Sequence, residues 1–171
     1  MTTGETMDHA QLFMAQWARE RPKTDTSGML TVARLTRLSV LIGKEIGQVH
    51  SDVSLGSWEF DVLATLRRQP PPHRSTIKGL LGMVMVSSAA MTHRIDRLVA
   101  RGLVRRFENP ESRRETFIEL TSEGLDSVEG VIDAHTDKCN EVVAGLTPRE
   151  HEQLDRLLLK VLASNGDIVG P

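Results

Sequence analysis

Apolar side chains recur every three or four positions along most of this chain, which is the spacing of amphipathic helices. The pattern predicts helices over residues 8–20, 29–51, 58–68, 76–84, 88–101, 122–144 and 148–163. Residues 29–51 are apolar over so broad an arc that this helix has to be covered on more than one side. The triple proline at 70–72 cannot continue a helix, so it predicts a rigid connection.

Polar residues mark where these helices begin. The expected N-caps are Asp8, Ser75, Ser87 or Ser88, Thr121 and Thr147. Gln11 completes a capping box with the first of these caps, and Glu150 completes another with the last. Gly102 follows the helix over 88–101 and is expected to end it.

The pattern changes after Gly102 into two runs typical of strands, LVRRFEN at 103–109 and RRETFIEL at 113–120. A turn, Asn109-Pro110-Glu111-Ser112, separates them and gives a hairpin with an arginine-rich tip. Two short helices followed by such a hairpin are the outline of a winged helix-turn-helix. The expected fold class is therefore mainly α with a small β-wing.

Charge is distributed unevenly along the chain, although the net charge is only −2. Residues 67–114 contain 11 lysines and arginines against 3 acidic residues, which gives +8; the remaining 10 basic and 20 acidic residues give −10. A locally basic segment on an acidic body is typical of a phosphate-binding surface. The helix–helix–hairpin lies within this segment, so the sequence predicts that it binds double-stranded DNA.

A helical wheel separates two faces of the helix over 88–101. Met91, Ile95 and Leu98 fall in one narrow sector and are expected to be buried, while Arg94 lies on the flank between the two faces. Small and hydrogen-bonding residues at its start can enter a major groove, and the arginines of the hairpin tip can enter a minor groove. The candidate DNA-binding residues are Ser87, Ser88, Ala89, Ala90, Thr92, His93, Arg97, Arg113 and Arg114.

Other chemistries find little support in the sequence. It contains no phosphate-cradling glycine loop, G-x-S-x-G, H-E-x-x-H or plausible pair of catalytic carboxylates, so no enzymatic activity and no cofactor are expected. His135 and Cys139 have a metal-compatible i, i+4 spacing, but both lie on an apolar stripe and are interpreted as core residues rather than a metal site. The single cysteine favours a reducing cytoplasm, and no apolar run approaches the length of a membrane span.

Three motifs carry a resemblance to a known family: T-x-R-I-D-R-L at 92–98, G-L-V-x-R at 102–106 and L-T-x-x-G at 120–124. They resemble the MarR family of winged helix-turn-helix regulators, whose members are obligate homodimers. The resemblance implies a MarR-type domain over 29–165, with the winged core at 54–121 and dimerisation helices at 29–51 and 122–163, and it leaves 8–20 as an extension helix. The family wing usually carries D-R-R, where this chain has Ser112 in place of the aspartate.

A narrower resemblance involves the extension helix. W-x-x-E-R-P at 17–22 and E-F-D-V-L-x-x-L-R-R at 59–68 are similar to the urate-responsive branch, which includes the PecS-like regulators. That resemblance implies a ligand site made of Trp17, Asp61, Arg94 and Arg106. The alternative is structural: Trp17 in the core, Asp61 paired with Arg94, and Arg106 on phosphate.

The expected function is a ligand-responsive transcriptional repressor that binds a palindromic operator as a homodimer and is released by a small planar anion such as urate. In one alternative the regulator responds to a phenolic or other anion, or to oxidation at Cys139. A more remote alternative is a dimerisation adaptor that does not bind DNA.

Overall fold

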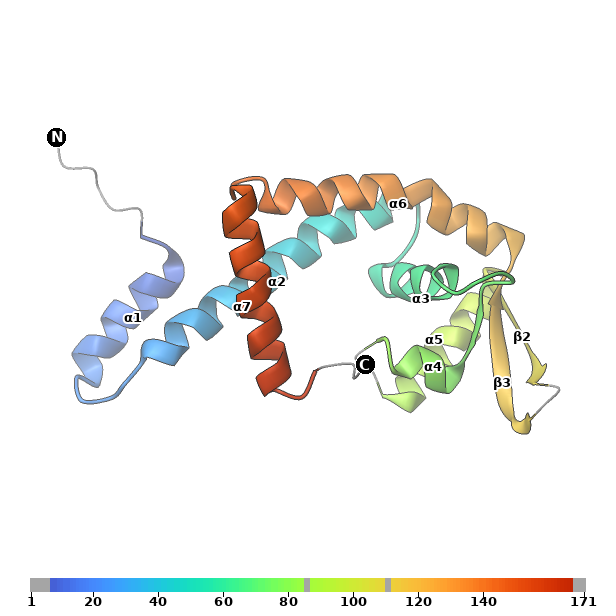
Figure 1. The fold of residues 1–171 in the computed structure, drawn as a ribbon, viewed down its shortest axis with the longest axis horizontal. Coiled ribbons are helices and arrows are strands. Elements are labelled where there is room, and N and C mark those ends of the chain that lie inside the picture. The colour runs from blue at the N-terminus through green and yellow to red at the C-terminus, as the bar shows by residue number, and fades with distance from the viewer. Residues whose placement is uncertain (1–6, 85–86, 110–111, 168–171) are drawn as a thin grey trace. The chain divides into compact units, whose positions relative to one another are not determined.

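The computed structural model describes residues 7–84, 87–109 and 112–167, with the side chains of 112–114 outside the description. Helices and strands follow one another in the order α1 His9–Glu20, α2 Ser27–Ser51, α3 Ser57–Arg67, β1 Arg74–Thr76, α4 Ile77–Leu81, α5 Ser88–Ala100, β2 Val104–Asn109, β3 Ser112–Leu120, α6 Ser122–Val143 and α7 Pro148–Ser164 (Figure 1). The fold is mainly helical with a small β-wing, as the sequence predicts. Among the described residues, no helix is both long and apolar enough to cross a membrane.

Two compact parts make up the chain, residues 1–45 and 46–171. The first contains α1 and most of α2. Asp8 caps α1 by accepting from the backbone N–H of Gln11 at 2.8 Å, and the Gln11 side chain accepts from the Asp8 N–H, as expected. Arg34 of α2 donates to the Asp8 carboxylate at 2.8 Å, which fastens α2 to the start of α1.

The second part has one hydrophobic core beneath the helix–helix–wing unit. Val128 and Val131 of α6 pack into the same cluster as its largest fully buried apolar side chains, which come from α3, α4, α5 and the wing: Leu63, Leu66, Leu80, Met91, Ile95, Leu98 and Ile118. The three residues that the helical wheel places on the inner face of α5 are all among them. Because these residues leave water together, α5 has a defined rotation about its axis, which fixes its outer face.

The wing is a three-stranded antiparallel sheet in the order β1–β3–β2. The hairpin of β2 and β3 is as predicted, while the turn residues Pro110 and Glu111 lie outside the described part of the chain. β1 was not predicted, and it corrects one cap: Ser75 pairs with Ile118 in the sheet, and Thr76 caps α4 instead, accepting from the Gly79 N–H at 3.1 Å.

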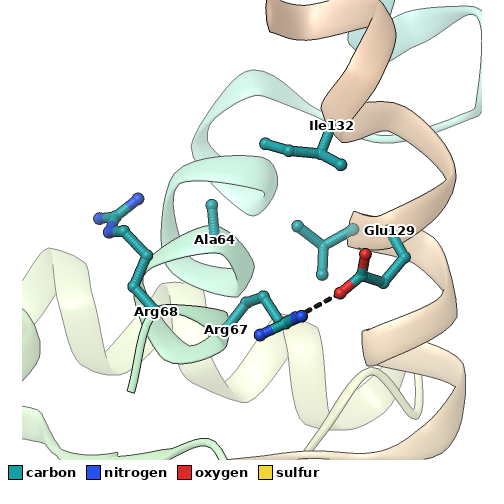
Figure 2. A pocket seen from close by; sticks show the side chains of 6 residues that line it. Ala64, Arg67, Arg68, Glu129 and Ile132 are labelled. Atoms are coloured by element: carbon teal, nitrogen blue, oxygen red, sulfur yellow. Dashed lines mark hydrogen bonds and ion pairs between the residues drawn. The ribbon is translucent and has the colours of Figure 1, made fainter. Parts of the chain in front are cut away.

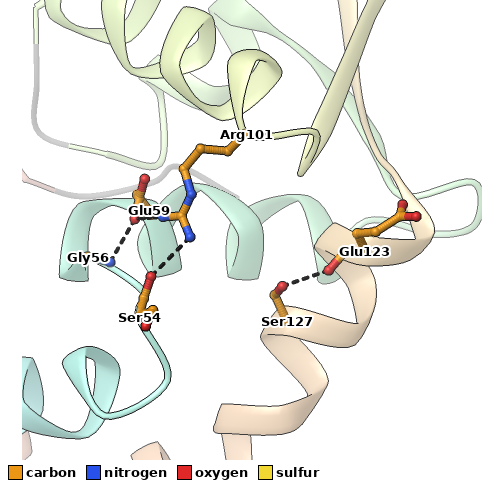
Figure 3. A network of polar contacts seen from close by, with 6 residues as sticks. All are labelled: Ser54, Gly56, Glu59, Arg101, Glu123 and Ser127. Carbon is orange, nitrogen blue, oxygen red and sulfur yellow. Dashed lines mark hydrogen bonds and ion pairs between the residues drawn. The ribbon is translucent and has the colours of Figure 1, made fainter.

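A glycine and a buried carboxylate fix the end of α5 and the start of α3. Gly102 has a φ of +71° and ends α5, as expected. Glu59, at 4% exposure, accepts from the Gly56 N–H at 2.7 Å and pairs with Arg101 at the end of α5. Arg101 also donates to the Ser54 carbonyl at 3.0 Å, so one guanidinium ties α5 to the segment that precedes α3 (Figure 3).

Three aromatic rings join α2, α3 and α6 in the core of the second part. His50, at 1% exposure, stacks on Phe60 with ring centroids 4.3 Å apart, and His50 Nε2 lies 3.0 Å from His135 Nδ1. His135 Nε2 is 3.6 Å from Cys139 Sγ. Among the described residues, no group of three His, Cys, Asp or Glu side chains is arranged to hold a metal ion.

Candidate nucleic-acid interface and ligand site

The outer face of α5 begins at Ser87, whose hydroxyl accepts from the Ala90 N–H at 3.2 Å and caps the helix. Thr92 Oγ1 donates to the Ser88 carbonyl at 3.1 Å, which leaves its lone pairs available as acceptors. The helical candidates for DNA contact are all exposed: Ser87, Ser88, Ala89, Ala90, Thr92, His93 and Arg97. The structure therefore places them along one solvent-facing surface of a single helix.

Arg113 and Arg114, the wing candidates, lie on β3 by their backbone, and their side chains are outside the described part of the chain. The base of the wing is described. There, Arg105 Nε donates to the carboxylate of Glu119 at 3.0 Å, with the carboxylate buried on the neighbouring strand. This pair keeps β2 and β3 in register below the tip.

Arg94 and Arg97 of α5 both lie over the indole of Trp58, a residue that the sequence patterns do not single out. Trp58, half-buried in the first turn of α3, has Arg97 at 4.9 Å and Arg94 at 5.6 Å from a ring centroid. Arg94, which the wheel placed on the flank of α5, is half-buried and turned toward this ring. An i, i+3 pair of arginines is visible in the sequence, but their contact with α3 depends on the fold.

Arg106 of β2 has a carboxylate partner that the sequence did not predict. Its Nη2 donates to Asp96 of α5 at 2.9 Å, and both side chains are at least one-third exposed. Asp61 on α3 is exposed, and among the described residues it forms no ion pair, so the alternative of a structural Asp61–Arg94 pair is wrong. No described hydrogen bond or ion pair joins Asp61, Arg94 and Arg106 to one another.

Trp17 belongs to the other part of the chain and is 46% exposed, so its interpretation as a core residue is wrong for the single chain. Its indole borders two hollows within that part. One, of about 280 Å³, is also lined by Arg21, Thr24, Thr26 and Met29; the other, of about 520 Å³, is apolar. Trp17 is therefore open to a planar ligand.

A further cavity of about 220 Å³ lies between α3 and α6 (Figure 2). Ala64, Val128 and Ile132 form an apolar wall, and Arg67 pairs with Glu129 beside it. Arg68 also lines the cavity and donates to Thr65 Oγ1 at 2.9 Å, without a carboxylate partner among the described residues. The cavity thus combines an apolar wall with an unneutralised cation.

The pKa values of His50 and His135 are lowered below their ordinary value, chiefly by burial. For His50, the neighbouring charge of His135 lowers the pKa further, whereas the carboxylate of Asp61 opposes the lowering for both. Two imidazoles in contact at 3.0 Å are compatible with the neutral state, in which one ring donates and the other accepts. The sequence offers no sign of this contact, because the residues are 85 positions apart.

Comparisons with known proteins agree with the winged helix-turn-helix geometry. The model of the MarR family matches residues 57–116, which span α3 to β3. Among curated proteins, the HTH-type transcriptional regulator PecS of Dickeya dadantii is 34% identical over 146 residues, covering 85% of this chain and 88% of that protein.

Solved structures show the same fold. A MarR mutant from E. coli complexed with operator DNA has a TM-score of 0.72 at 26% identity, and the match covers 82% of this chain and 99% of that one. BpsR of Bordetella bronchiseptica, whose DNA binding is regulated by 6-hydroxynicotinic acid, has a TM-score of 0.68 at 26% identity, with 75% and 90% covered.

Proposed function

We propose that this chain, which belongs to the MarR family of transcriptional regulators, acts as a homodimeric repressor that a small planar anion such as urate releases from its operator. Membership of the family makes it a DNA-binding transcriptional regulator. The observation that carries the proposal is the outer face of α5, with exposed hydrogen-bonding residues at its start and the guanidinium of Arg97 further along.

On DNA, we place α5 in the major groove and the tip of the wing in the adjacent minor groove. Arg97 and His93 are the side chains proposed to read base edges, while Arg113 and Arg114 contact the minor groove. Ser112 stands where a carboxylate would orient those arginines, so tip contacts are expected to add affinity for all sequences more than preference among them.

Dimerisation is proposed through α2 and α7. α7 begins with the predicted capping box, yet it has no buried residue in the single chain, and Leu157 and Leu159 are more than half exposed. In α2, Val32, Val40 and Leu41 are likewise exposed. We propose that a second copy covers these apolar faces. To enter successive major grooves of a palindromic operator, the two α5 helices of that dimer have to lie about 34 Å apart, one turn of the DNA.

The ligand site is proposed to comprise Trp17, Asp61, Arg94 and Arg106. Three observations support it: Trp17 is open beside two hollows, Asp61 has no ion-pair partner among the described residues, and Asp96 holds Arg106 only at the surface. A planar anion can compete with Asp96 for Arg106 and accept forked hydrogen bonds from Arg94. Release follows only if the anion binds the DNA-incompetent state more tightly.

A second candidate ligand is a single-ring organic acid, and the cavity between α3 and α6 favours it. Its volume of about 220 Å³ is below the ~300–1,000 Å³ of pockets for drug-sized molecules. In this alternative Arg68 binds the carboxylate and Arg68→Ala abolishes release by the acid, whereas Asp61→Ala leaves it intact. An oxidation response at Cys139 is a third possibility, with the His135 imidazole beside the thiol.

DNA binding is tested by fluorescence anisotropy on a labelled duplex from the region upstream of the chain's own gene. Affinity should fall steeply with salt, and Arg113→Ala should reduce the salt slope by about 2, which is about 1 for each half-site of the dimer. Arg97→Ala should cost about 1–3 kcal/mol per half-site on the operator and relax base preference. Arg19→Ala, at an exposed position of α1, removes the same charge away from α5, the wing and the proposed dimer helices, and serves as the matched control. Salt-independent binding or none would favour a dimerisation adaptor.

A further inference from the structure

The indole of Trp58 is shared by two cations of α5. Arg97 lies 4.9 Å and Arg94 5.6 Å from a Trp58 ring centroid, both inside the about 6 Å over which a guanidinium is attracted to an aromatic face. The ring itself is fixed, because Trp58 packs against the core cluster in the first turn of α3. Gly56 lets the segment before α3 lie close to the indole, because a Cβ at this position would lie 3.3 Å from Trp58 Nε1.

We propose that Trp58 is a positioning residue that orders Arg94 and Arg97 before the operator is bound, a role that rests on the proposed contact of α5 with DNA. A stacked ring orients a guanidinium without using its N–H donors. The contrast is Arg106, which donates to the carboxylate of Asp96 and is thereby neutralised. Among the described residues, no carboxylate pairs with Arg94 or Arg97, so the charge and donors of Arg97 are available to DNA and those of Arg94 to the proposed ligand.

This arrangement lowers the entropic cost of binding. An arginine free in solvent samples many rotamers and has to be immobilised when it meets a base or phosphate, which weakens binding. An arginine already stacked on a fixed ring has lost part of that freedom during folding. The α3–α5 contact at Trp58 is backed by the Glu59–Arg101 pair, one turn beyond Arg97 at the C-terminal end of α5, so the ring and the helix are held together (Figure 3).

The test is a mutant cycle on operator affinity, with the full chain and the labelled upstream duplex. Trp58→Leu should weaken operator binding about tenfold, because each half-site then orders its arginines on binding. Trp58→Phe, which keeps an aromatic face, should recover most of that loss. In an Arg97→Ala background, Trp58→Leu should cost at most about threefold, because most of what Trp58 positions is then gone.

Stability measurements distinguish the positioning role of Trp58 from a purely structural role. Urea unfolding of each variant establishes the fraction folded at the assay temperature, and affinities are compared per folded dimer. If Trp58→Leu binds the operator as tightly as the wild type, or loses tenfold equally with and without Arg97, the positioning role is wrong. If Arg97→Ala alone retains full affinity, the proposed DNA contact of Arg97 is wrong, and the positioning role is overturned with it.

Discussion

At the residue scale, Gly124 shows why the L-T-x-x-G motif ends in glycine. A Cβ at this position would lie 1.9 Å from the carbonyl oxygen of Leu103, where β2 is about to begin. That backbone atom cannot move without displacing the wing. The glycine therefore lets the first turn of α6 pass directly against the segment that links α5 to the wing.

Replacing this glycine is a sharp test of that packing. Gly124→Ala should destabilise the protein by about 1–3 kcal/mol or more, because the new methyl group overlaps backbone. Gly130→Ala in the same helix is the control: nothing lies within 4 Å of its Cβ, so it should stabilise by about 0.4–1 kcal/mol. Urea unfolding measures both, and equal effects would contradict the packing.

The buried pair of His50 and His135 predicts a pH dependence of stability. Both pKa values are lowered from 6.5 in the folded chain, so the unfolded chain binds more protons once the pH drops below about 6.5. The stabilisation is therefore complete above pH 6.5 and is lost as the pH falls toward the lowered pKa values. Melting temperatures between pH 7.5 and 5 should show this loss.

A matched substitution identifies the source of that loss. His135→Gln should flatten the pH dependence, since one of the two titrating imidazoles is removed and the other loses its charged neighbour. His9→Gln, at an exposed position of α1 away from the buried pair, is the matched control. A pH profile that is identical in all three proteins would show that the buried pair does not cause it.

Individual residues were predicted well wherever the information is local. The caps, the glycine stop and the buried face of α5 depend on spacings of three or four residues, and they are confirmed except for Ser75. Contacts between distant segments were missed: His50 with His135, Trp58 with Arg97, and Asp96 with Arg106. Such contacts depend on how helices pack, which a local pattern does not contain.

At the element scale, the seven helices and the hairpin follow from periodicity, while β1 does not. Its three residues are too few for an alternating pattern, and Thr76 directly after Ser75 is an equally good cap. The strand exists because β3 offers an unpaired edge to the segment leaving the prolines. Pairing with β3, rather than the local sequence, therefore determines that residues 74–76 form a strand.

The Glu59–Arg101 ion pair joins α3 to α5, and its contribution to the free energy of unfolding can be measured. Glu59→Ala should destabilise the protein by about 1.5–3 kcal/mol, because the buried carboxylate accepts from both Gly56 and Arg101. Glu129→Ala removes the carboxylate of an exposed ion pair with Arg67 and should cost less than about 1 kcal/mol. Urea unfolding compares the two, and a Glu59→Ala loss no larger than that of Glu129→Ala would refute the anchoring role.

At the scale of the whole molecule, α5 carries both the residues proposed to read the operator and an arginine of the proposed ligand site. Arg94 and Asp96 lie on α5 between the residues proposed to read DNA, and Asp96 holds Arg106 of the wing. An anion that takes Arg94 and Arg106 would therefore act on α5 and the wing together. The sequence identified the four ligand candidates by resemblance, and how they assemble in the dimer stays a prediction.

The most direct measurement is an anisotropy titration of urate into the complex of the protein with its own upstream DNA, with xanthine and unrelated anions as controls. We predict that urate releases the DNA from the wild type. Asp61→Ala and Trp17→Ala should bind the duplex with wild-type affinity and resist release. DNA that stays bound at saturating urate, with no shift in melting temperature, would contradict the assignment of the ligand, as would normal release from both variants.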